Sequence, residues 1–146
     1  MRDVQTRKAD VLAALHRQGD LWVASADSRG RPHLIAVSAW WDGAEIVIAT
    51  TVASRTAKNL AANPVARLAQ GLPGDAIVID ARVIETKAAE QSAELAKSFA
   101  GAVGWDPREV GPGWSFFRLR PVRIQAYRGY DELEGRDVML RSEWLA

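Results

Sequence analysis

Residues 45–64 read EIVIATTVASRTAKNLAANP. The apolar run 46–49 predicts a buried strand that ends in the hydroxyl residues Thr50 and Thr51. A short turn follows, and the sequence predicts a helix that begins near Ser54. This succession, a strand that ends in two hydroxyl residues and is followed by a turn and a helix start, is the clearest indication of a binding site in the sequence.

The start of this helix is suited to hold a phosphate. Ser54 offers a hydroxyl, the first turn of a helix offers free N–H groups, and Arg55 and Lys58 add positive charge. A cation in a first helical turn is electrostatically misplaced unless an anion is present. Each group also has a simpler explanation. Arg55 and Lys58 could lie on a solvated helix face and pair with carboxylates, and Ser54 could serve only as an N-cap. Thr50 and Thr51 could be ordinary strand residues.

Composition limits the class of protein. The 146 residues suit one domain, and no repeat or linker divides them, so we expect a single domain over residues 1–146. Cysteine is absent, which excludes disulfides and thiolate metal sites. The 19 Lys+Arg against 18 Asp+Glu give a net charge of +1, so neither nucleic acid nor a membrane is an expected partner. A charged, amphipathic first stretch and the absence of a long apolar run favour a cytoplasmic protein.

The first part of the chain predicts one helix and three successive strands. The amphipathic helix is expected over Asp3–Arg17, and the strands over Leu21–Ala26, Pro32–Trp41 and Glu45–Thr51. Asp42-Gly43 is a strong signal for a tight turn, because both residues tolerate positive φ. These strands therefore form an antiparallel meander.

The second part continues the β pattern. Strands are expected over Val65–Gln70, Ala76–Glu85, Trp114–Arg120 and Val122–Tyr127, with a helix that begins at Thr86, an irregular segment at Gly101–Gly113 and a polar tail from Arg128. Pro121 fits an edge or a bend in the last strand segment. The fold class is therefore mainly β with flanking helices, a six- to seven-stranded antiparallel barrel that is closed or nearly closed.

Other candidate groups give weaker signals. Trp40 and Trp41 are neighbours on a strand, so one ring should face the core and the other a cleft or an interface. Neither His16 nor His33 has a ligand partner at metal spacing, and no metal site is expected. No hydrolase elbow, dinucleotide fingerprint or P-loop is present, so no side chain is assigned a catalytic role.

Five pieces of the sequence, in this order and spacing, carry a resemblance to a known family. They are GRPHLIAVSAWWDG, the pair Thr50-Thr51, SRTAKNL, NPVARLAQG and FRLRPVRIQAYRG. The chain resembles, from about Leu21 to Tyr127, the split β-barrel superfamily of pyridoxamine 5'-phosphate oxidase-like flavoproteins and their relatives that use the deazaflavin coenzyme F-420. The resemblance implies a split β-barrel that binds FMN or F-420.

The resemblance also implies which residues bind the cofactor. Leu34, Ile35, Ala36, Val37 and Ser38 would lie along the flavin ring, Ala49, Thr50 and Thr51 would meet its pyrimidine edge or the ribityl phosphate, and Ser54, Arg55 and Lys58 would bind the phosphate. In such proteins the cofactor lies at a homodimer interface, so Trp114, Phe116 or Arg118 would reach it from the partner chain. One position departs from the family: the oxidases have Ser-Arg-Lys where this chain has Ser54-Arg55-Thr56, and Lys58 would have to supply the missing charge.

The function implied by this resemblance is that of an FMN- or F-420-dependent oxidoreductase. The bound flavin or deazaflavin would carry out hydride transfer to or from a small organic substrate, with no obligatory acid or base from the protein. The alternative is a dimeric carrier that binds a flavin, haem or tetrapyrrole without turnover. A purely structural or interaction role is the third hypothesis.

Overall fold

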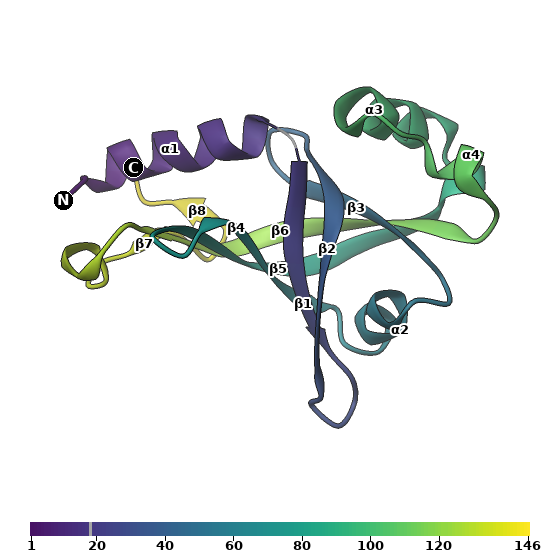
Figure 1. Cartoon of the computed structure of the whole chain (residues 1–146), viewed down its shortest axis with the longest axis horizontal. Helices are drawn as coiled ribbons and strands as arrows, with labels where there is room; N and C mark the ends of the chain where they lie inside the picture. Colours follow the sequence, from purple (N-terminus) through teal and green to yellow (C-terminus); the bar gives the residue numbers. More distant parts are fainter. Residues whose placement is uncertain (18) are drawn as a thin grey trace.

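The computed structural model describes residues 1–17 and 19–146. Within this part of the chain, four α-helices and two short 3-10 helices flank the strands (Figure 1). The helices are α1 (Val4–His16), α2 (Arg55–Ala62), η1 (Ala89–Gln91), α3 (Ala93–Val103), α4 (Pro107–Val110) and η2 (Tyr130–Glu132). None of them combines the length and the apolar character needed to cross a lipid bilayer.

The strands of the described residues form one antiparallel sheet that closes on itself. They are β1 (Gly19–Ala26), β2 (Pro32–Trp41), β3 (Ile46–Thr51), β4 (Val65–Leu72), β5 (Asp75–Ala88), β6 (Trp114–Tyr127), β7 (Asp137–Leu140) and β8 (Glu143–Trp144). Their order is β3-β2-β1-β4-β5-β6-β7-β8, and the pairing of β3 with β6 closes a six-stranded barrel. The predicted class, mainly β with a closed antiparallel barrel, is confirmed, and β7 and β8 extend the sheet beyond it.

Two apolar cores hold the fold together. The barrel interior contains fully buried side chains from successive strands, such as Val23, Leu68 and Ile79, because alternate residues of a strand point to the same face. A second core lies on the outer face of β3 and β6, where Phe99 of α3 packs against Phe116. The second core fixes α3 against the outside of the barrel.

The barrel is split between β2 and β3. The two strands pair only from Ala39–Ile48 to Trp41–Ile46, whereas β1 stays paired with β2 as far as Pro32. Beyond Ile48, β3 leaves β2 and follows β6 up to the pair Thr51–Trp114. We call the opening between residues 34–38 of β2 and 49–51 of β3 the fork. The β1–β2 hairpin extends away from the barrel beside α2 (Figure 1).

The helix predicted from Thr86 begins later. β5 continues to Ala88 and pairs with β6 as far as Ser115, so residues 86–88 are strand. A register shift between Val83 and Glu85 lets the strand bend. Pairing with β6 therefore overrides the helical pattern of this stretch, and α3 starts only at Ala93.

Three further expectations need correction in detail. The segment expected to be irregular contains the end of α3 and all of α4, whose N-cap Asp106 accepts a hydrogen bond from the amide of Arg108 (2.9 Å). Pro121 does not interrupt the last strand segment, because β6 is continuous and absorbs the proline with a register shift between Asp80 and Ala81. The tail also forms the short hairpin β7–β8.

Candidate functional site

The turn between β3 and α2 brings the hydroxyls of Thr50 and Ser54 into contact. Thr50 Oγ1 donates a hydrogen bond to Ser54 Oγ (2.8 Å), and Ser54 Oγ also accepts from the amide of Ala57 (3.0 Å). Ser54 is therefore the N-cap of α2, as its alternative interpretation predicted. Since its oxygen is already an acceptor twice, the Ser54 hydroxyl hydrogen remains to be donated to a ligand.

The start of α2 carries uncompensated positive charge. Arg55 and Lys58 are exposed, and neither forms an ion pair or side-chain hydrogen bond within residues 1–17 and 19–146. The amides of Arg55 and Thr56 also lack partners there, as expected at a helix N-terminus. Pairing of these cations with carboxylates, the alternative left open by the sequence, is thus not found in this part of the chain. This donor set fits a phosphate.

Thr56 has a different environment from its neighbour Arg55. Its side chain is 1% exposed, and its Oγ1 has no hydrogen-bond partner among the described residues. Thr56 occupies the position at which the resembling oxidases have a lysine, and here the side chain faces the interior. Thr56 is uncharged, and because its side chain is buried, its hydroxyl is not accessible to a ligand at the surface of α2.

The predicted ring strand presents two different faces. Leu34, Ala36 and Ser38 lie on the outer face of β2, whereas Ile35 and Val37 lie on the face toward the barrel interior, because successive side chains alternate. Leu34 is 61% exposed and Ile35 40% exposed, since the far half of the hairpin extends beyond the barrel. A planar ring can lie on one of these faces, so the five residues cannot all contact it through their side chains.

The other predicted contacts differ in accessibility. The side chain of Ala49 is buried in the second core, so only its backbone can meet a ligand in the fork. Thr51 is half-buried and lies beside Trp114, its partner in the β3–β6 pairing. Trp114 is half-buried within its own chain and packs edge-on against Trp105, with ring centroids 5.2 Å apart. The structure thus brings Thr51 and Trp114 together within one chain.

Trp105 contacts one side of the fork, at Ser38, and was not assigned to the candidate site from the sequence. Its indole Nε1–H donates a hydrogen bond to Ser38 Oγ (3.0 Å), which places the turn that precedes α4 against the outer face of β2. The same ring packs edge-on against Phe99, at a centroid distance of 5.8 Å. The sequence around Trp105 gave no signal for this contact, because Trp105 and Ser38 are 67 positions apart.

Two residues that were expected to reach a partner chain make their contacts within their own chain. Phe116 is 1% exposed and packs in the second core, so it is not available to a partner. Arg118 forms ion pairs with Asp42 (2.6 Å) and, at 3.7 Å, with Glu45 and Glu85. Its charge is therefore neutralised by its own chain.

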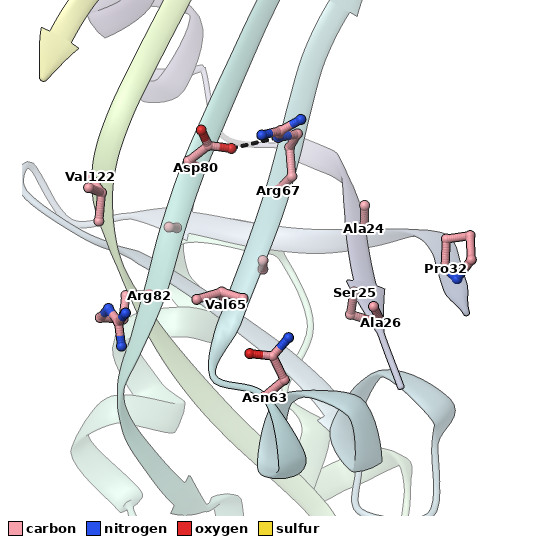
Figure 2. A pocket seen from close by; sticks show the side chains of 12 residues that line it. Ala24, Ser25, Ala26, Pro32, Asn63, Val65, Arg67, Asp80, Arg82 and Val122 are labelled. Atoms are coloured by element: carbon pink, nitrogen blue, oxygen red, sulfur yellow. Dashed lines mark hydrogen bonds and ion pairs between the residues drawn. The ribbon is translucent and has the colours of Figure 1, made fainter. Parts of the chain in front are cut away.

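A separate hollow of about 530 Å³ lies on the outer face of β1, β4 and β5 (Figure 2). An ion pair between Arg67 Nε and Asp80 Oδ1 (2.6 Å) crosses it from β4 to β5, while Arg82 and Asn63 lie toward its other end (Figure 2). None of the predicted cofactor residues lines this hollow. It is distinct from the fork.

The family of the chain follows from its sequence as well as from its fold. The family model described as pyridoxamine 5'-phosphate oxidase matches residues 8–128, which include both sides of the fork and α2. The chain therefore belongs to this family. A search of curated proteins gives no significant match.

Solved structures with the same fold have names that refer to different ligands. An F-420 reductase aligns with a TM-score of 0.66 and 17% identity over 77% of this chain and 93% of its own. An FMN-binding, pyridoxamine 5'-phosphate oxidase-related protein from Nostoc punctiforme aligns with a TM-score of 0.60 and 15% identity over 86% of each chain. A heme-binding protein from Mycobacterium smegmatis aligns with a TM-score of 0.67 and 18% identity over 94% of this chain and 57% of its own. At these identities the likeness establishes the fold.

Proposed function

We propose that this protein binds FMN or the deazaflavin coenzyme F-420 in the fork and is an oxidoreductase acting on a small organic substrate. The observation that carries the proposal is the start of α2, where the Arg55 side chain and two backbone amides have no partner among the described residues. Exposed cations beside unsatisfied amides are a favourable place for a phosphate. Membership in the oxidase family supports the same ligand class.

The protein's part in this function is to bind and orient the cofactor. The cofactor, when bound, supplies the hydride chemistry. Arg55 and Lys58 would hold its phosphate, helped by the Ser54 hydroxyl, while the outer face of β2 provides an apolar surface for a ring at Leu34 and Ala36. Trp105 would limit the ring's position along β2 and exclude water at Ser38.

We further propose a homodimer that holds the cofactor at its interface, in the cytoplasm. Apolar side chains near the fork support it: Trp22 is 50% exposed and lies beside Ala36 in the β1–β2 pairing, and Leu34 is 61% exposed. Such a cluster is typical of a surface that another protein covers. A second copy of the chain would bury it next to the fork.

The second candidate is a carrier that binds a flavin, haem or tetrapyrrole without turnover. The likeness to a heme-binding protein of this fold favours it. The absence of an assigned catalytic acid or base is compatible with both candidates, because hydride transfer needs neither.

Fluorescence titration with FMN and with F-420 tests the proposal. We expect saturable binding of one of them to the purified protein. We also expect hydride transfer to that cofactor from NAD(P)H as donor, or from the reduced cofactor to quinones or other small acceptors. Binding without any turnover would favour the carrier. Failure of both cofactors to bind would refute the proposed function.

A further inference from the structure

A small cavity lies next to the start of α2, and it is separate from the hollow on the outer face of β1, β4 and β5. It has a volume of about 240 Å³ and is lined by Asp27, Arg31, Pro32 and His33 of the β1–β2 hairpin and by Arg55 of α2. Arg55 is the first residue of α2, where the phosphate is proposed to bind, and it also lines this cavity. A role for this cavity in anion binding therefore rests on the proposed function, because Arg55 is also the proposed phosphate ligand.

Of the charged side chains that line the cavity, Asp27 and Arg31 pair with each other, whereas Arg55 has no counterion among the described residues. Asp27 Oδ2 accepts from Arg31 Nε (2.7 Å), and its Oδ1 accepts from the amides of Arg29 and Arg31, both at 2.9 Å. Hydrogen bonds from Arg31 lower the pKa of Asp27, which keeps this carboxylate ionised and paired with Arg31. The charge of Arg55 has no such counterpart among the described residues. The cavity consequently has one net positive charge while His33 is neutral.

His33 has no hydrogen-bonding role in the described fold. Its side chain is half-buried and makes no hydrogen bond there, and it faces Ser25 across the β1–β2 pairing. Ser25 already accepts a hydrogen bond from Asn59 Nδ2 of α2 (3.1 Å). The charged groups that line the cavity around His33 are Asp27 and Arg31 from the turn and Arg55 from α2. The imidazole is thus free to bind a ligand.

We propose that protonated His33 joins Arg55 as a ligand of a phosphate dianion and makes anion binding in this cavity depend on pH. Two positive charges then match the two negative charges of a phosphomonoester. His33 would supply the charge that Thr56, buried in the interior, does not provide. Lys58 does not line the cavity.

The direction of the pH dependence follows from linkage. An unperturbed histidine has a pKa of about 6.5, and a bound anion stabilises its protonated form and raises this pKa. Anion binding therefore takes up a proton at His33, and this contribution to affinity grows as pH falls from 8 to 6. The phosphate's own protonation near a pKa of about 6 acts in the opposite direction, so the effect must be measured against a variant without His33.

Nuclear magnetic resonance titration of the histidines tests this proposal directly, because the sequence has only two. His16 is exposed on α1 and interacts with the carbonyl of Leu12, so it serves as an internal control. His33→Gln assigns the resonances. We expect saturating inorganic phosphate to raise the pKa of His33 by about one unit and to leave that of His16 unchanged. Equal responses of the two histidines would overturn the proposal.

A second measurement separates this inference from the proposed function. The affinity for FMN, measured at pH 6 and pH 8, should rise about three- to tenfold more on acidification in the wild type than in His33→Gln. His16→Gln is the matched control and should behave like the wild type. Identical pH profiles for the wild type and His33→Gln would refute the role of His33 while leaving cofactor binding intact. A phosphate response at His33 without binding of FMN or F-420 would refute the proposed function and support the anion cavity.

Discussion

One buried side chain, Glu132, links the N-terminal segment to the C-terminal part of the chain. Glu132 is 3% exposed and accepts hydrogen bonds from the amide of Arg2 (2.7 Å), from Arg2 Nη2 (2.7 Å) and from the amide of Arg128 (2.8 Å). The hydrogen bonds from Arg2 are the main cause that lowers the pKa of Glu132 to about 2. This contact joins the segment that precedes α1 to the segment that follows β6.

Acid should therefore weaken the fold through Glu132. A glutamate in the unfolded chain has a pKa of about 4.3, so the stabilisation is complete above that pH and is lost as pH falls toward 2. We expect Glu132→Gln to lower the free energy of unfolding by about 2 kcal/mol at pH 7, with a smaller difference from the wild type at pH 3. Urea denaturation at several pH values measures this. The exposed Glu134→Gln is the control, and an equal loss in both variants would contradict the assignment.

Some residues of the candidate site could be predicted from the sequence and others could not. The cap at Ser54 and the unpaired Arg55 were predictable, because they depend on neighbours within one turn of helix. Trp105 was not, because its contact with Ser38 joins distant parts of the chain. His33 was considered only as a metal ligand, and nothing in the sequence indicated that it shares a cavity with Arg55.

At the scale of elements, local signals predicted most of the barrel. Turn residues and alternation located β1 to β4, including the Asp42-Gly43 turn, where the amide of Asp42 donates to the carbonyl of Glu45 (3.0 Å). The helical pattern after Thr86 was misleading, because pairing with β6 holds residues 86–88 in the sheet. The split itself was expected only from the family resemblance, since the loss of pairing beyond Ala39–Ile48 has no local signature.

For the whole molecule, one exposed apolar surface lies beside the fork, at Trp22 and Leu34. Trp22 is a large aromatic side chain that stays half-exposed in a single chain, and it neighbours the proposed ring surface. Residues of this kind contribute much of the binding energy in protein interfaces. The homodimer proposal therefore assigns Trp22 to the contact between two copies.

Replacing this residue should weaken the dimer. We expect Trp22→Glu to shift the monomer–dimer equilibrium toward monomer by at least about tenfold, because a charge would be buried against apolar surface. Light scattering coupled to size-exclusion chromatography measures the change. Tyr130→Glu alters an aromatic residue that is 94% exposed and should leave the equilibrium as it is. A monomeric wild type, or a dimer insensitive to Trp22→Glu, would contradict the proposed interface.

The central claim is that the start of α2 holds the phosphate of a flavin-type cofactor. The most direct measurement is the affinity of the double variant Arg55→Ala, Lys58→Ala for the cofactor that the wild type binds, followed by fluorescence titration. Lys97→Ala, which removes an exposed lysine from α3, is the matched control, and thermal unfolding checks that each variant is folded. The predicted result is a loss of at least about tenfold in affinity for the double variant and none for the control. An unchanged affinity in a folded double variant would contradict the claim.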